Sequence, residues 1–148
     1  NEVYAGKNYE EFDQQVIIDT LNVGILAPLL LTHGLIPLMS SGSNIINISG
    51  TFESGAKGWL PYYVSKRAIE DLTIGLAQEL ERKDIQVNAI SPSDCATFAY
   101  KKYFPQYIDE AIAPEKVADF IVNLCQKNTT GKVFVLKKDQ EPFTSFHY

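Results

Sequence analysis

A tyrosine and a lysine with complementary acid–base chemistry lie four positions apart, as Tyr62 and Lys66. On a helix, four residues at 100° each leave two side chains about 40° apart, so both can reach one bound group. A phenol, with a pKa near ~10, is a reluctant base at neutral pH, and a neighbouring ammonium favours its charged form. Lowering that pKa to about 7 requires roughly 4 kcal/mol, which a close lysine and a second positive charge can supply. The pair therefore suits proton transfer at an oxygen atom.

Two alternatives to this interpretation stay open at the level of the residues. Tyrosine and lysine at this spacing also occur on ordinary solvent-facing helices, where the pair has no chemical role. Tyr63, three positions before Lys66, can reach the same lysine. Spacing alone therefore does not decide which tyrosine acts.

A helix is predicted to carry the pair. Pro61 suits its first position, and the helical pattern covers residues 62–82. The apolar face of this helix is expected to consist of Ser65, Ile69, Leu72, Leu76 and Leu80.

Short apolar segments rich in β-branched residues precede and follow that helix. They have the character of buried parallel strands and cover residues 44–49, 85–90 and 132–136. Further helices are predicted over residues 9–39 and 114–127. Helix and strand therefore alternate three times, which predicts an α/β fold with a parallel sheet and helices on both faces.

The first predicted helix, residues 9–39, is hydrophobic on nearly every side, and Pro28 and Pro37 should bend or end it. A helix of this kind must be covered on both faces. We therefore expect it to contribute to the interface of a homodimer or homotetramer.

Several motifs occur together in one order and spacing: Asn22, the strand at 45–49, Tyr62-x-x-x-Lys66, and the segment 87–92 with Thr97. In combination they resemble the C-terminal two thirds of a classical short-chain dehydrogenase/reductase, over about residues 11–135. The resemblance implies a partial Rossmann-like, doubly wound parallel sheet made of the last three strands and their helices. It also implies that residues 1–148 form a single partial domain, and that the whole protein is an NAD(P)-dependent oxidoreductase interconverting an alcohol and a carbonyl.

The resemblance assigns roles to individual residues. Tyr62 is expected to be the catalytic acid/base, and Lys66 to bind the nicotinamide ribose and lower the pKa of the tyrosine. Ser49 is expected to orient the reacting oxygen, and Asn22 to support a water-linked proton path to the lysine. Pro92 and Thr97 are expected beside the nicotinamide, with Thr97 holding its carboxamide.

Two of these assignments have alternatives. Asn22 can instead be a helix-interior polar residue that satisfies a bent backbone. The family serine often follows another small residue, so its place can fall on Gly50, with Thr51 or Ser54 as substitutes for Ser49.

The glycine-rich turn that binds the cofactor pyrophosphate in this family is not recognisable in the chain. No two of the nine glycines are two positions apart, and no acidic or basic selector between NAD and NADP can be identified. The chain is expected to begin just past the family's Asn-Asn-Ala-Gly strand. The alternative function is a catalytically incomplete, dehydrogenase-like fragment that acts as an assembly module.

Composition restricts the possible partners. The charges that give a net −5 are scattered, which argues against nucleic acid. The longest apolar stretch, residues 23–31, is shorter than the roughly 18 residues of a membrane span, so no membrane partner is expected. Cys95 and Cys125 have no metal-ligand spacing, which predicts a cytoplasmic protein without a metal. A small carbonyl or alcohol substrate fits best, in a pocket with aromatic walls contributed by residues 97–113.

Overall fold

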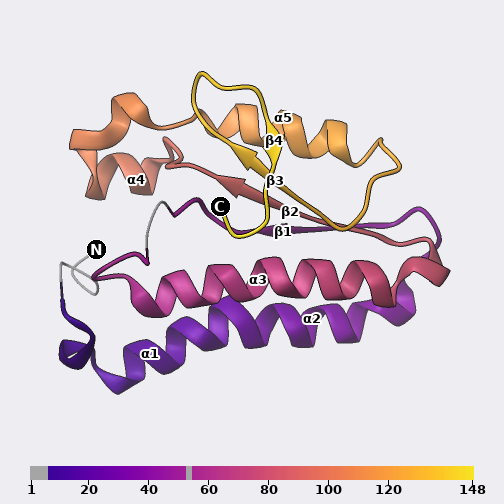
Figure 1. Ribbon diagram of the computed structural model, residues 1–148, viewed down its shortest axis with the longest axis horizontal. Helices are drawn as coiled ribbons and strands as arrows, with labels where there is room; N and C mark the ends of the chain where they lie inside the picture. The colour runs from indigo at the N-terminus through magenta and orange to yellow at the C-terminus, as the bar shows by residue number, and fades with distance from the viewer. Residues whose placement is uncertain (1–6, 53–54) are drawn as a thin grey trace.

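A four-stranded sheet forms the centre of the chain, in the order β1-β2-β3-β4 (Figure 1). The computed structural model describes residues 7–52 and 55–148. The parallel strands are β1 (Asn44–Ile48), β2 (Gln86–Pro92) and β3 (Lys132–Leu136). These are the three predicted strands, and β2 extends through Pro92 instead of ending before it. The fourth strand, β4 (Phe143–Thr144), was not predicted; it pairs antiparallel with β3 and is only two residues long.

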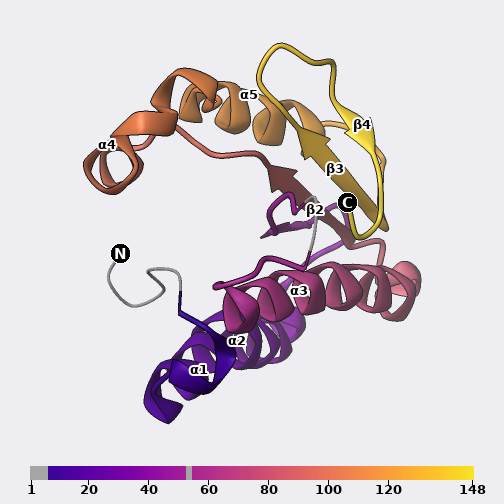
Figure 2. The same ribbon diagram turned by 60° about the vertical axis from the view of Figure 1, so that its left-hand side comes forward.

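Helices cover both faces of the sheet, as predicted (Figures 1 and 2). On one face lie α1 (Gln14–Leu21), α2 (Ala27–Leu35) and α3 (Leu60–Glu79). The other face is covered by α5 (Pro114–Leu124), and the shorter α4 (Phe98–Tyr103) follows β2. Short 3-10 turns extend these helices or join them to the strands, at Tyr9–Glu11, Ile36–Leu38, Glu81–Lys83 and Pro105–Glu110.

The core is divided by the sheet into two hydrophobic clusters. Side chains of β2 alternate between its two faces, so Val87 packs towards α3 and Ile90 towards α5, and both are fully buried. The α3 cluster also contains Ala77, Leu80 and Ile85, and the α5 cluster Ile112, Leu124 and Leu136. This packing fixes the carboxyl end of β2 relative to α3, where the predicted catalytic residues lie.

The buried face of α3 differs in part from the prediction. Ser65, Ile69 and Leu80 are buried as expected, whereas Leu72 and Leu76 are only half-buried. Two polar residues, Glu70 and Thr73, take up buried positions that the apolar pattern did not indicate. The Thr73 hydroxyl bonds to the Ile69 carbonyl and accepts from Asn47, which satisfies it inside the core.

The first helix is continuous from residue 14 to 38, but it contains one wide π turn at Asn22–Leu26. Pro28 follows in the first turn of α2 and does not end the helix, but the π turn lies directly before it. Pro37 lies in the 3-10 turn Ile36–Leu38 with which the helix ends, as expected. By length and mean hydropathy alone, the 25 residues Gln14–Leu38 could cross a membrane, which corrects the statement that no stretch is long enough. Core helices of soluble proteins satisfy the same criteria. Large side chains remain exposed along it, among them Val23 (74%) and Leu38 (81%).

Candidate active site

The first turns of α3 bring Tyr62 and Lys66 together, as their spacing predicted. The Lys66 ammonium lies 5.4 Å from the centre of the Tyr62 ring. It also donates a hydrogen bond to the carbonyl of Ile48, the last residue of β1, at 2.9 Å. Burial lowers the pKa of Lys66 below its ordinary value. The lysine is thus held between the strand and the tyrosine.

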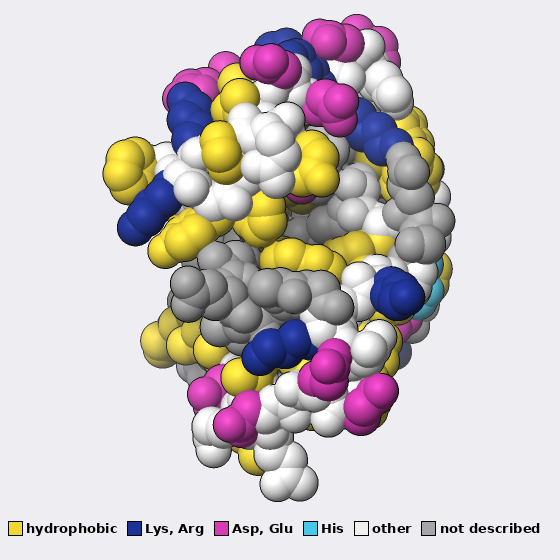
Figure 3. Space-filling model, turned by 90° about the vertical axis from the view of Figure 1, so that its left-hand side faces the viewer, with side chains coloured by type: hydrophobic (Ala, Val, Ile, Leu, Met, Phe, Trp, Pro, Cys, Tyr) yellow, Lys and Arg dark blue, Asp and Glu magenta, His cyan; other side chains and the backbone are white. Residues whose placement is uncertain are grey.

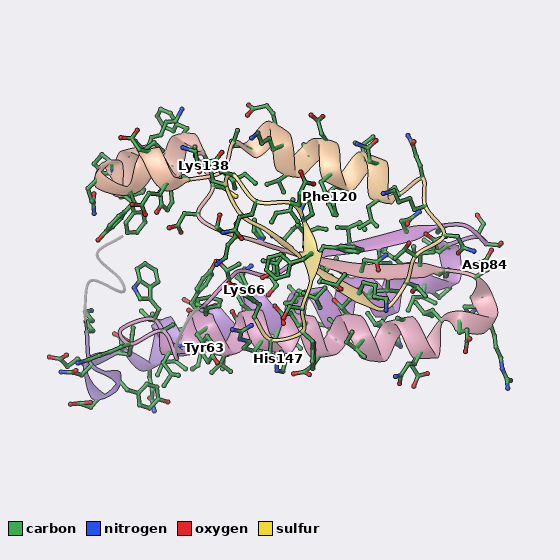
Figure 4. All side chains as sticks on the ribbon, turned by 45° about the horizontal axis from the view of Figure 1, so that its top comes forward. Tyr63, Lys66, Asp84, Phe120, Lys138 and His147 are labelled. Atoms are coloured by element: carbon green, nitrogen blue, oxygen red, sulfur yellow. The ribbon has the colours of Figure 1, made fainter. Side chains whose placement is uncertain are left out.

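Tyr63 points away from this arrangement. Its ring packs against the Phe52 ring at 5.1 Å, and the Arg67 guanidinium lies 5.1 Å from its centre. Figure 4 labels Tyr63 and Lys66 on this helix. Tyr62 lines the neighbouring cavity and Tyr63 does not. Spacing alone did not decide between the two tyrosines, and only Tyr62 lies at the wall of the cavity.

A cavity of about 690 Å³ opens beside the pair. Its walls come from the carboxyl ends of β1 and β2, the start of α3, and the segment of α4 and the 3-10 turn after it. Figure 3 looks at this end of the molecule, where hydrophobic side chains gather around the hollow. Of the predicted site residues, the cavity is lined by Ser49, Tyr62, Lys66, Pro92 and Thr97.

Asn22 is not among the residues that line the cavity. It begins the π turn and is exposed, and within the described part of the chain no hydrogen bond joins it to Tyr62 or Lys66. The turn itself touches α3 closely: a Cβ added to Gly24 would lie 2.6 Å from the Ser65 Cβ. A glycine is therefore required where the π turn meets the residue before Lys66.

The Ser49 hydroxyl is engaged in the interior. Ser49 is 3% exposed, and its Oγ lies 2.7 Å from a Glu70 carboxylate oxygen and 3.0 Å from the Lys66 carbonyl. Thr51, two residues later, is half-buried and lines the cavity, and its N–H bonds to the Pro92 carbonyl at 3.3 Å. Ser54, the other alternative, lies outside the described residues. Of the two described hydroxyls that directly follow β1, those of Ser49 and Thr51, only that of Thr51 makes no hydrogen bond within the described residues.

Aromatic rings form much of the cavity wall. The Trp59 ring lies 6.3 Å from that of Tyr62 and 6.1 Å from that of Phe104, and the Phe52 ring lies 6.0 Å from Tyr62. The predicted wall from residues 97–113 is thus joined by two residues that precede Tyr62. Phe98, which is 86% exposed, takes no part in the cavity.

Polar groups follow the end of β2 at the edge of the cavity. Burial, and next a hydrogen bond to Asp94, raise the pKa of Tyr100. Burial also raises the pKa of the Cys95 thiol. Thr97 caps α4 by accepting the N–H of Tyr100 at 3.1 Å. Asp94 was not predicted as a site residue, although its place two residues after the end of a parallel strand indicated one.

The chain is similar in sequence to known dehydrogenases. A sequence profile described as short chain dehydrogenase matches residues 3–108. "Dehydrogenase/reductase SDR family member 4" of Homo sapiens is 30% identical over 140 residues, which cover 83% of this chain and 50% of that protein. "NADPH-dependent aldehyde reductase 1, chloroplastic" of Arabidopsis thaliana is 33% identical over 92 residues, 62% of this chain and 32% of that one.

Solved structures resemble the chain as well. The crystal structure of a short chain dehydrogenase from Escherichia coli CFT073, complexed with NADPH, has a TM-score of 0.76 at 27% identity. The match covers 88% of this chain and 57% of that one. The chain thus spans about half the length of the curated relatives it matches.

Proposed function

Because this chain belongs to the short chain dehydrogenase family, we propose that it provides the proton-transfer site of a nicotinamide-dependent oxidoreductase that interconverts an alcohol and a carbonyl. The observation that supports the proposal is the Tyr62–Lys66 pair, with a 5.4 Å separation between the ammonium and the ring, at the wall of a cavity of about 690 Å³. The proposal applies to the whole protein, since the chain spans about half the length of the curated relatives it matches.

The residues at the end of β2 suit a nicotinamide dinucleotide. The Ser93 hydroxyl lines the cavity and is buried without a hydrogen-bond partner in the described part of the chain. Lys66 has three donors, of which one is bonded to Ile48, and Thr97 adds a hydroxyl at the rim. Lys66, Pro92 and Thr97 would therefore hold the nicotinamide riboside. When bound, this group supplies or accepts the hydride. NAD and NADP are both compatible with these residues.

Tyr62 carries out the proton transfer in this proposal. In reduction its hydroxyl donates a proton to the carbonyl oxygen, and in oxidation its phenolate removes the proton from the alcohol. The Lys66 ammonium stabilises the phenolate in both directions. We assign the orientation of the reacting oxygen to Thr51 and not to Ser49, since the Ser49 hydroxyl is already bonded to Glu70.

The walls favour an uncharged carbonyl compound with an aromatic or similarly flat apolar body. Rings of Phe52, Trp59 and Phe104 surround the space beside Tyr62 and offer edges and faces for stacking. Lys66 is the single cation among the described residues that line the cavity, and Asp94 adds an anion. A substrate carboxylate would therefore have no cation of its own and would lie near a like charge.

The test is turnover of the protein, expressed with whatever sequence precedes Asn1 in its gene, with NADH and with NADPH. Aryl aldehydes, aliphatic ketones and keto acids form the substrate panel. We expect activity on the aryl compounds and a loss of about 10²-fold or more in Tyr62→Phe. The matched control is Tyr63→Phe, which should keep its activity because that ring faces Phe52 and Arg67. Unchanged turnover in Tyr62→Phe would refute the mechanism.

A second function, a non-catalytic assembly module, is favoured by the apolar surface of the first helix. Val23, Leu30, Leu31 and Leu38 are each more than 60% exposed. The same surface would serve the homodimer or homotetramer expected of an active enzyme, so assembly alone does not separate the two functions. Titration calorimetry of the chain with NADH and NADPH separates the two functions, because tight binding of either dinucleotide would exclude the non-catalytic module.

A further inference from the structure

The segment after β3 returns across α3 and reaches the wall of the cavity. β4 pairs with β3, and the residues after it run back over α3, where Figure 4 labels His147 (Figures 1 and 4). We call residues 143–148 the strap. The proton-transfer chemistry described above does not use it.

The strap is fastened to α3 through Glu70, whose side chain is fully buried. One carboxylate oxygen accepts the Ser49 hydroxyl at 2.7 Å, and the other accepts the backbone N–H of His147 at 2.7 Å. The Arg67 guanidinium lies 3.6 Å from the second oxygen. A carboxylate is tolerated in the interior only when donors and an opposite charge surround it in this way. Glu70 thereby joins the end of β1 to the strap.

Arg67, almost one turn earlier on α3, makes a parallel connection. Its guanidinium donates to the Tyr148 carbonyl at 2.6 Å and to the Phe52 carbonyl at 3.3 Å. The Phe52 N–H also donates to the Tyr148 carbonyl, at 3.2 Å. Because Phe52 lines the cavity beside Tyr62, the strap supports one wall of the cavity from behind.

The same connection reaches the catalytic lysine. The Ser49 hydroxyl, held by Glu70, lies 3.0 Å from the Lys66 carbonyl, and the preceding carbonyl, that of Ile48, accepts the Lys66 ammonium. We propose that Glu70 is a positioning residue that ties the strap to the end of β1 and so fixes both Lys66 and the Phe52 wall. Its catalytic consequence rests on the proposed function, whereas the fastening of the strap does not.

The test replaces Glu70 with glutamine, with Asp71→Asn as the matched control. Asp71 is the next residue, its side chain is 62% exposed, and it meets the strap through the His147 imidazole at 3.4 Å. Amide hydrogen exchange at Ser49 and Phe52, measured without substrate, should become about tenfold faster or more in Glu70→Gln and stay unchanged in Asp71→Asn. In turnover assays kcat should fall in Glu70→Gln alone. Wild-type protection of both amides in Glu70→Gln would overturn the proposal.

A second pair of variants decides the question even if Glu70→Gln does not fold. His147 has a φ of +56° and contacts Glu70 through its backbone, so His147→Gly keeps the donor and suits that conformation. His147→Pro removes the N–H and cannot adopt a positive φ. Phe52 should exchange faster in the proline variant only, and equal exchange in the two variants would refute the role of the strap. If the wild type reduces no carbonyl, the proposed function fails, while the exchange data still decide the role of Glu70.

Discussion

Replacing Gly24 with alanine tests the close approach between the π turn and α3. An added Cβ would lie 2.6 Å from the Ser65 Cβ and 2.7 Å from its Oγ. Ser65 directly precedes Lys66, so any movement that relieves this overlap also moves the lysine. The substitution should therefore lower stability and activity together.

Two effects of opposite sign determine how much Gly24→Ala changes the free energy of unfolding. Alanine is favoured over glycine inside a helix by about 0.8–1 kcal/mol. Ordinary carbon contacts are about 3.5–4.0 Å, so the new Cβ overlaps the Ser65 Cβ by about 1 Å. Relieving such overpacking costs about 1–3 kcal/mol, and here it requires backbone movement because a Cβ cannot rotate away. We expect a net loss of up to about 2 kcal/mol.

Urea denaturation measures this loss, and two other glycines provide controls. Gly34 in α2 and Gly75 in α3 have no atom within 4 Å of an added Cβ among the described residues. Gly34→Ala and Gly75→Ala should therefore be neutral or stabilising by up to about 1 kcal/mol. In a double variant, Ser65→Gly should remove most of the loss of stability caused by Gly24→Ala, because it removes the atoms that the new Cβ overlaps. If Gly24→Ala is as stable as Gly34→Ala, the reasoning from close approach is refuted.

Two further predictions concern the site. Burial lowers the pKa of Lys66 from its ordinary 10.5. Between the lowered pKa and 10.5, the unfolded chain therefore binds more protons than the folded chain. The free energy of unfolding should rise with pH across that range. The free energy of unfolding of Lys66→Met should therefore exceed that of the wild type most at neutral pH, and the difference should disappear near pH 10.5. Urea denaturation measures both proteins, and a difference that does not change with pH would contradict the lowered pKa. Thr51→Ala should lower kcat by about 10²-fold with little change in stability. Ser49→Ala should instead lose about 1–3 kcal/mol of stability by removing a donor from Glu70, and a reversed pattern would return the orienting role to Ser49.

Local patterns were sufficient to predict the alternation of helix and strand. β3 consists of residues 132–136, as the run of apolar and β-branched residues predicted, and Tyr62 and Lys66 share a helix face as their period requires. β4 could not be predicted, because two residues after Pro142 carry no periodic signal. The width of the π turn was not predicted, since its residues fit an α-helical pattern. Pro28, four positions after Gly24, did indicate a distortion there, because a proline lacks the N–H that would bond to that carbonyl.

The direction of polar side chains depends on partners that are distant in sequence. Ser49 lines the cavity, and its hydroxyl is bonded to Glu70, twenty-one positions away. Glu70 in turn reads as part of the solvent face of a helix, because charged residues are rarely buried without a partner. Its burial depends on the His147 N–H and on Arg67, which come from the strap and the same helix. Arg67 is local, but the His147 N–H is 77 positions away, and no local pattern contains that contact.

The position of Tyr62 within α3 also contributes to the proposed chemistry. It is the third residue of a twenty-residue helix, and the first turn of a helix leaves unpaired N–H groups that favour negative charge nearby. Helical side chains lean towards the N-terminus, so the phenolic oxygen is directed to that end. Lys66, one turn later, leans the same way and brings its ammonium beside the ring. Both contributions favour the phenolate, whereas a pair in the middle of α3 would have only the lysine.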